Sequence, residues 1–205
     1  MDELGRLMHP AVFQTFEEIL RSYAVHGDVL EIGATPDDST LLNLPALAAA
    51  RKKIGINKVG ASRHNDFSIL EADANAMTCF PEQSFDAVLC NAVLEHDPFF
   101  WKTLAEIRRV TRSGGLVAIG VPGYRQLPFE KTVRSWLARL PRSSRRPDGW
   151  AIQHSTLTLG VHNFPGDYYR FSEQAVREVF FAGAENVVIR SVLVPPRIIG
   201  AGIRP

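Results

Sequence analysis

The chain has 205 residues, of which 45% are hydrophobic and 22% charged, and a formal net charge of +1. These values are ordinary for one globular domain with a substantial core, and they give no electrostatic reason to expect nucleic acid as a partner. Two cysteines are too few for a disulfide framework, and we expect both to be small buried hydrophobes.

No apolar run in the sequence reaches the ~18 residues that a membrane-spanning helix needs. The first residues begin with an acid and lack the long apolar region of a signal peptide. We therefore expect a cytoplasmic protein.

The first predicted element is an amphipathic helix over residues 9 to 25. Its apolar side chains recur at three- and four-residue spacings, and charged residues lie between them. Pro10 suits the first turn of such a helix. The pattern is compatible both with a helix that covers a sheet and with a lid whose amino end closes over a ligand.

A short buried strand follows at Val29 to Gly33, and a polar turn then leads into a leucine-rich segment at Leu41. We interpret this as strand, tight turn and helix start. In an open α/β sheet the first such unit lies at the carboxyl edge, where these folds bind ligands. A glycine lets the backbone approach a ligand, and a helix start offers unpaired N–H groups. Taken alone, the stretch is equally compatible with a purely structural turn.

Downstream, apolar runs alternate with helical patterns. The further predicted strands cover residues 53–57, 67–72, 85–91, 116–121, 187–194 and 197–203. Helices are predicted over residues 98–111 and 172–181, and residues 58–66 are predicted as a polar loop. This alternation predicts a mostly parallel sheet with right-handed crossovers. The joint at Pro195 and Pro196 is too short for a crossover, so the last two strands should pair antiparallel.

Residues 122 to 170 break the alternation and are predicted to form a small cap inserted into the domain, because proline and glycine recur throughout. Within it, a basic helical piece carries Lys131, Arg134, Arg139, Arg142, Arg145 and Arg146. The basic piece is interpreted as the solvated face of a cap helix or as a weak contact site for a membrane surface.

The ordered motifs VLEIG, IGIN, ADANAM, SFDAVLCNAVLEH and EIRRVTRSGGLVAIGVP resemble those of the class I S-adenosylmethionine-dependent methyltransferases, and most of all the type 11 group. The resemblance covers residues 28 to 122. It implies one Rossmann-like α/β domain over residues 1–205. Such a domain has a seven-stranded, mostly parallel sheet with an antiparallel C-terminal strand, and helices on both faces. A late segment of the HNFPGDYYRF type is loosely associated with sugar or glycoconjugate pathways.

The resemblance also implies which residues hold the cofactor, S-adenosylmethionine. These are Glu31, Gly33 and Ala34 beside its methionine part, Asn57 at the ribose, Asp73 and Ala74 at the adenine, and Asn91 and Ala92 at the sulfonium. Two departures from the family pattern stand out. The turn after the first strand keeps a single glycine and contains Pro36, and Asn57 stands where the family has a carboxylate. An amide offers one acceptor oxygen where a carboxylate offers two, so cofactor binding should be weakened or compensated elsewhere.

Methylation of a hydroxyl needs a base, and two clusters contain candidates. His96 lies in Glu95-His96-Asp97, directly after the fourth predicted strand, and has an ordinary pKa of about 6.5. His162 and Asp167 lie in the aromatic stretch 162–171, which would suit a substrate wall. The alternatives are that His96 caps local backbone and that Asp167 pairs structurally with Arg170. No spacing of histidine, cysteine or acidic residues predicts a metal site.

The sequence therefore predicts an enzyme that transfers a methyl group from S-adenosylmethionine to a small-molecule acceptor, as an O-methyltransferase acting on a sugar or glycoconjugate. One alternative is a catalytically silent protein that keeps the fold as a binding or scaffold module. Another, motivated by the basic piece, is a peripheral membrane enzyme with a lipid-linked acceptor.

Overall fold

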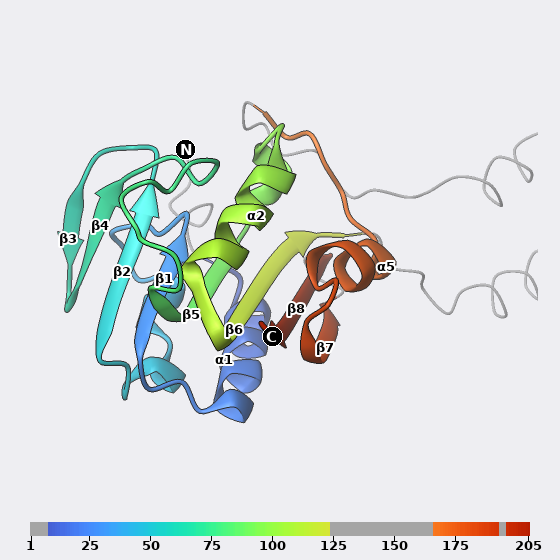
Figure 1. Cartoon of the computed structure of the whole chain (residues 1–205), viewed down its shortest axis with the longest axis horizontal. Helices are drawn as coiled ribbons and strands as arrows, with labels where there is room; N and C mark the ends of the chain where they lie inside the picture. Colours follow the sequence, from blue (N-terminus) through green and yellow to red (C-terminus); the bar gives the residue numbers. More distant parts are fainter. Residues whose placement is uncertain (1–7, 124–165, 193–195) are drawn as a thin grey trace, which may run out of the picture.

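The computed structural model describes residues 8–123, 166–192 and 196–205. Its strands are β1 (Asp28–Ile32), β2 (Lys52–Asn57), β3 (Ser62–His64), β4 (Phe67–Glu71), β5 (Phe85–Asn91), β6 (Thr111–Pro122), β7 (Glu185–Val192) and β8 (Arg197–Ile203). They form one eight-stranded sheet in the order β3-β4-β2-β1-β5-β6-β8-β7 (Figure 1). The five strands β4, β2, β1, β5 and β6 run parallel, whereas β8 runs antiparallel to both β6 and β7. The predicted Rossmann-like α/β class is confirmed.

The sheet has one strand more than the seven predicted. The extra strand, β3, lies in the predicted loop 58–66 and pairs antiparallel with β4 through a tight turn at Asn65 and Asp66. Asn65 adopts a φ of 50°, a conformation that asparagine tolerates better than most residues. The three residues of β3 are all polar, so no alternation of apolar and polar residues marks the strand in the sequence.

Helices cover both faces of the sheet, as predicted. On one face lies α1 (Pro10–Tyr23), and on the other lie α2 (Phe100–Val110) and a C-terminal helical piece (Figure 1). That piece consists of α5 (Glu173–Ala175) and the π-helix η5 (Val176–Phe180), and Ser172 caps its start by accepting a hydrogen bond from the Ala175 N–H at 3.0 Å. Successive strand residues feed the two apolar layers alternately: Val29 packs on the α1 side and Leu30 on the α2 side.

The helix expected after β1 is not formed. Residues 41–50 instead make two short 3₁₀ turns, η2 (Leu41–Asn43) and η3 (Pro45–Leu47). Pro45 explains the difference, because it has no N–H to donate and holds Leu44 in an extended conformation. The leucines of this segment are buried under α1 and fill that layer of the core.

The predicted cap lies mostly outside the described residues, but its two ends are described. Gly123, at the end of β6, pairs with Phe171 in an isolated parallel bridge, and the Phe171 N–H donates to the Pro122 carbonyl at 3.0 Å. The chain therefore leaves and rejoins the domain at one place.

The structure also bears on the expectations for the two cysteines and for membrane-spanning helices. Cys90 is buried, whereas Cys79 is exposed, so only one of the two cysteines packs as expected. No helix in the described ranges is long and apolar enough to cross a membrane.

The packing of α1 generates a stability prediction. Phe16 is fully buried, and its ring lies against Gly120 in β6, where an added Cβ would come within 2.9 Å of it. Phe16→Ala should lower the free energy of unfolding by about 3–5 kcal/mol, because a cavity replaces the ring. Gln14→Ala, on the exposed side of the same helix, should cost less than about 1 kcal/mol. Chemical denaturation measures both, and equal losses would contradict the assigned buried face.

Candidate active site

The carboxyl ends of β1, β2, β4 and β5 lie at the same edge of the sheet, because these strands run parallel. From β1 the chain adds β2 and then β4 on one side of β1, and it then crosses back to add β5 on the other side of β1. Open α/β sheets bind ligands at such a switch point. All eight residues predicted to hold the cofactor lie at or just after these four strand ends, or in the last residues of the strands.

Glu31 is buried in β1, and its carboxylate faces the segment that follows the strand. It accepts hydrogen bonds from the Thr40 hydroxyl and from the backbone N–H groups of Leu41 (3.0 Å) and Leu42 (3.2 Å). The N–H groups that the sequence offers to a ligand are thus bound by the protein's own carboxylate. Burial raises the pKa of Glu31 to about 7, although these hydrogen bonds oppose the rise.

The turn after β1 is held tightly to β2. The N–H groups of Gly33 and Ala34 both donate to the carbonyl of Ile56, at 2.8 and 3.1 Å. Gly33 has a φ of +82°, and an added Cβ would lie 2.4 Å from Cγ2 of Val93, just after β5. Glycine is required here on both counts, and the ends of β1 and β5 are brought into close contact.

Asn57, at the end of β2, fixes the same turn from the side. Its Nδ2 donates to the Ala34 carbonyl at 2.9 Å, and its Oδ1 accepts from the Val59 N–H at 3.3 Å. Both ends of the amide are therefore engaged within the protein. A ribose hydroxyl would have to share the amide oxygen or use its second N–H.

Asp73 follows β4 and is half-exposed at the edge. Its Oδ1 accepts from the Asn75 N–H at 2.9 Å and lies 3.5 Å from Nζ of Lys58, the residue after β2. The Asn75 N–H and the Lys58 ammonium together hold the pKa of Asp73 below its usual range, so it is a charged acceptor at neutral pH. Ala74 beside it is buried.

Asn91 and Ala92 end β5 at the centre of the edge. Oδ1 of Asn91 is buried and has no hydrogen-bond partner among the described residues. Ala92 has a φ of 55°, which costs a non-glycine residue about 1 kcal/mol or more, and its N–H donates to the Gly120 carbonyl at 3.0 Å. Strained backbone and a buried unpaired acceptor are typical of a ligand-facing position.

The short 3₁₀ helix η4 (Leu94–His96) and its C-cap Asp97 contain three consecutive ionisable residues in different environments. Glu95 is fully buried, and its Oε1 pairs with the Arg197 guanidinium at 2.9 Å. Asp97 is buried and accepts from the Thr103 hydroxyl (2.7 Å), the Asn75 amide (2.8 Å) and the Phe99 N–H (2.9 Å). His96 is half-buried at the end of the turn. The two carboxylates thus hold the fold at this edge.

Asp167, which the sequence offers as a candidate base, lies in the described part of the chain. Its buried carboxylate makes two hydrogen bonds to the Arg170 guanidinium, at 2.5 and 2.6 Å, which is the structural pairing held open as the alternative. His162 lies outside the described residues.

Sequence reasoning missed Arg197 and Asn75 as members of this edge. Arg197 begins β8 directly after two prolines, and a lone arginine opening an otherwise apolar strand is a signal that could have identified it. Asn75 bonds across to Asp97, 22 residues away, and no local pattern reveals such a contact.

Within the described part of the chain, no group of three histidine, cysteine or acidic residues could hold a metal ion. A nucleoside cofactor fits the edge better. Asp73 offers a charged acceptor, and Asn91 offers a buried unpaired one. These residues fit S-adenosylmethionine, whereas the side chains of Glu31 and Asn57 are already used inside the fold.

Comparison with known proteins points the same way. Residues 40–119 match the family described as "Methyltransferase domain". Over 103 residues the chain is 34% identical to the demethylmenaquinone methyltransferase of Renibacterium salmoninarum, covering 47% of this chain and 43% of that protein. The chain thus spans less than half the length of this relative.

Two solved structures share the fold. The 1,6-didemethyltoxoflavin-N1-methyltransferase of Burkholderia thailandensis, with bound S-adenosylhomocysteine, superposes with a TM-score of 0.61 at 16% identity, covering 95% of this chain and 78% of that one. A chain from the Haloferax volcanii complex with the Trm112 methyltransferase activator superposes with a TM-score of 0.59 at 16% identity. The match covers 96% of this chain and 95% of that one. At these identities the likeness shows the fold alone.

The raised pKa of Glu31 predicts a pH dependence of stability. The folded protein binds this proton more tightly than the unfolded chain, so the free energy of unfolding should fall as pH rises from about 4.5 to about 7. The fall should reach at most about 3 kcal/mol. A carboxyl-carbon NMR titration should show Glu31 changing near pH 7. Glu106 is the control, because the Arg109 guanidinium lowers its pKa. A Glu31 midpoint as low as that of Glu106 would contradict the prediction.

The contact between the ends of β1 and β5 can be tested at Gly33. Gly33→Ala should lower the free energy of unfolding by about 1–3 kcal/mol, through positive φ and the clash with Val93. Gly114→Ala is the matched control, since Gly114 also has a positive φ but no atom within 4 Å of an added Cβ. Adding Val93→Ala to Gly33→Ala should recover part of the loss. Equal losses at Gly33 and Gly114 would argue against a tight contact.

Proposed function

Residues 40–119 carry the methyltransferase domain of the class I S-adenosylmethionine-dependent family, and from this premise we propose that the chain transfers a methyl group to a small-molecule acceptor. The observation that carries the proposal is the edge formed by Gly33, Asp73 and Asn91, at the switch point of the sheet. The cofactor is S-adenosylmethionine, the group whose product form occupies the Burkholderia thailandensis relative.

When bound, S-adenosylmethionine supplies a methyl group on a positively charged sulfur. The residues of this chain would contribute binding and orientation, which is most of what a protein can offer to an in-line displacement. Gly33 and Ala34 border the methionine part, Asp73 and Ala74 hold the nucleoside, and Asn91 and Ala92 border the reacting centre. Glu31 and Asn57 contribute indirectly, because their hydrogen bonds hold the turn that carries Gly33 and Ala34.

We propose oxygen as the methylated atom and His96 as the group that takes the proton. His96 follows Asn91, the last residue of β5, by five residues, whereas the Asp167 carboxylate is held by Arg170. The exposed Tyr168 ring supports a sugar or another planar acceptor, since such faces stack on aromatic rings. His162 remains a candidate base. The named N1-methyltransferase among the structural relatives makes nitrogen the competing acceptor atom.

A second candidate function is a binding or scaffold module that has kept the fold without the chemistry. It is favoured by one observation: the two side chains that the family pattern directs at the cofactor, at positions 31 and 57, make their hydrogen bonds inside the protein. The two functions differ in whether the edge binds the cofactor and supports turnover.

Calorimetric titration with S-adenosylhomocysteine tests the proposal. We expect micromolar binding, and Asp73→Ala should weaken it about tenfold or more, because a hydrogen bond to a charged acceptor is lost. Asp66→Ala is the control: Asp66 also pairs with a lysine, at 2.7 Å, but precedes β4 and so lies at the opposite edge. Absence of binding would overturn the proposal, and equal effects of the two variants would overturn the placement of the nucleoside.

A further inference from the structure

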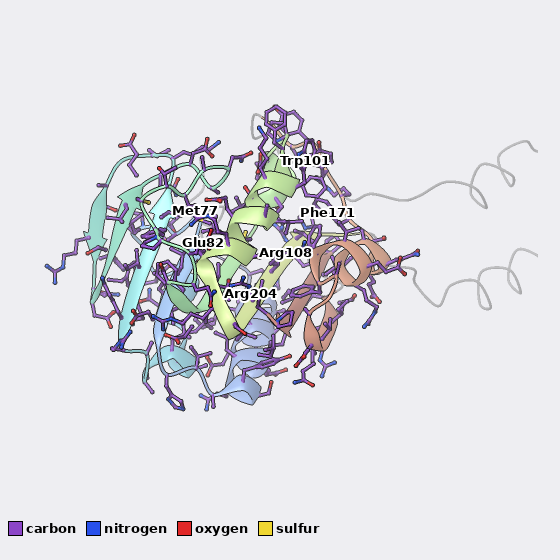
Figure 2. All side chains as sticks on the ribbon, viewed as in Figure 1. Met77, Glu82, Trp101, Arg108, Phe171 and Arg204 are labelled. Atoms are coloured by element: carbon purple, nitrogen blue, oxygen red, sulfur yellow. The ribbon has the colours of Figure 1, made fainter. Side chains whose placement is uncertain are left out.

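Three large aromatic side chains lie half-exposed where α2 begins and where the chain rejoins the domain. Phe99 is 49% exposed, Trp101 53% and Tyr168 57%. We call these three residues the aromatic patch. Figure 2 shows Trp101 at the upper end of α2. The Lys102 ammonium lies 4.8 Å from the centre of the Phe99 ring and adds a positive charge to the patch.

The patch is mounted on a rigid base. Phe100 lies beneath it and makes edge contacts with Trp101, Tyr169 and Phe171, at centroid distances of 5.5, 5.1 and 5.3 Å. The Tyr169 hydroxyl donates to the Pro98 carbonyl at 3.0 Å, and its N–H binds the Glu95 carbonyl at 3.3 Å. The exposed rings are therefore held in place by packed neighbours. Large apolar side chains held exposed on a fixed surface are typical of an interaction site.

The distribution of basic residues along the chain indicates the kind of surface that the patch contacts. The sequence between Gly123 and Gly166 contains seven basic residues and two acidic ones (Arg125, Lys131, Arg134, Arg139, Arg142, Arg145 and Arg146 against Glu130 and Asp148). Its net charge is +5 in a chain whose total is +1, so the rest of the chain carries −4. Positive charge is thus concentrated in one segment.

Both ends of this segment adjoin the aromatic residues. An added Cβ at Gly166 would lie 3.2 Å from the Tyr168 ring, and Gly123 bridges to Phe171, which contacts Phe100. Aromatic rings together with a lysine, at the two points where a segment of cationic sequence joins the domain, match the interface of an anionic bilayer. There, tryptophan and tyrosine sit at headgroup level and basic residues gain from the surface potential.

We propose that the aromatic patch docks the protein on an anionic phospholipid surface. Phe99 and Trp101 lie at the start of α2, soon after η4, and the Tyr168 N–H donates to the Glu95 carbonyl in η4 at 2.8 Å. The patch therefore lies at the carboxyl edge of the sheet that carries the candidate site. Docking through it brings that edge to the bilayer, where acceptors that partition into lipid are concentrated. The proposal does not depend on methyl transfer, because it concerns the surface beside the site.

Vesicle flotation tests it with the full chain. Vesicles of equal parts phosphatidylcholine and phosphatidylglycerol should carry the protein at low salt, and pure phosphatidylcholine vesicles should not. Binding should fall in about 0.5 M salt, where surface charges are screened. The double variant Phe99→Ala/Trp101→Ala should lose at least about tenfold in affinity for these vesicles, because two aromatic contacts with the interface are lost.

Val179→Ala is the matched control, since Val179 is 50% exposed but lies beside Arg108, two turns along α2 from the patch. Thermal unfolding checks that the double variant is folded. Lys102→Glu, which keeps the aromatic rings, should weaken binding to the anionic vesicles in a salt-dependent way. No flotation of the wild-type protein at low salt, or flotation unaffected by the double variant, would overturn the proposal. A protein partner for the patch would give the first of these outcomes.

Discussion

The buried carboxylate of Glu31 is the interaction on which the rest of the ligand-binding edge depends. It sits in the central strand and holds the start of η2 through a hydroxyl and two backbone N–H groups. A buried carboxylate is unfavourable without such donors, and the donors would be unsatisfied without it. Strand and following turn are therefore stable only together. The path of the chain from β1 towards β2 is fixed by this one group.

The turn after β1 is held by side-chain hydrogen bonds, whereas the family pattern has a glycine-rich turn at this place. Asn57 binds the Ala34 carbonyl, and Asp37 accepts from the Ser39 N–H at 2.8 Å and from the Thr35 hydroxyl at 3.0 Å. Pro36 between them has no N–H to satisfy. A turn built this way is less free to adapt to a ligand than a glycine-rich one, because several side-chain bonds must break for it to move. Any cofactor must fit the turn as it stands.

The sequence carried enough information for the fold class, for most of the strands and for the antiparallel pairing of the last two, because buried strands and amphipathic helices leave periodic patterns. It could not reveal β3, whose residues are all polar, or the replacement of a helix by two 3₁₀ turns around Pro45. The residues predicted for the site lie together at one edge of the sheet, but the sequence did not reveal the partners of their side chains. Asp97 with Asn75 and Glu95 with Arg197 are contacts between distant segments, and only the folded chain brings them together.

The pairing of Gly123 with Phe171 has a consequence for how such a protein can change over evolution. Because the chain leaves and rejoins the domain at one bridge, the two ends of the sequence between Gly123 and Phe171 are held together. Doubling the number of residues between two joined points of a flexible chain costs only about 0.6 kcal/mol of closure entropy. The segment can therefore be lengthened, shortened or exchanged while the sheet and its ligand edge stay in place. The same bridge is a natural boundary for exchanging this segment with that of a related chain.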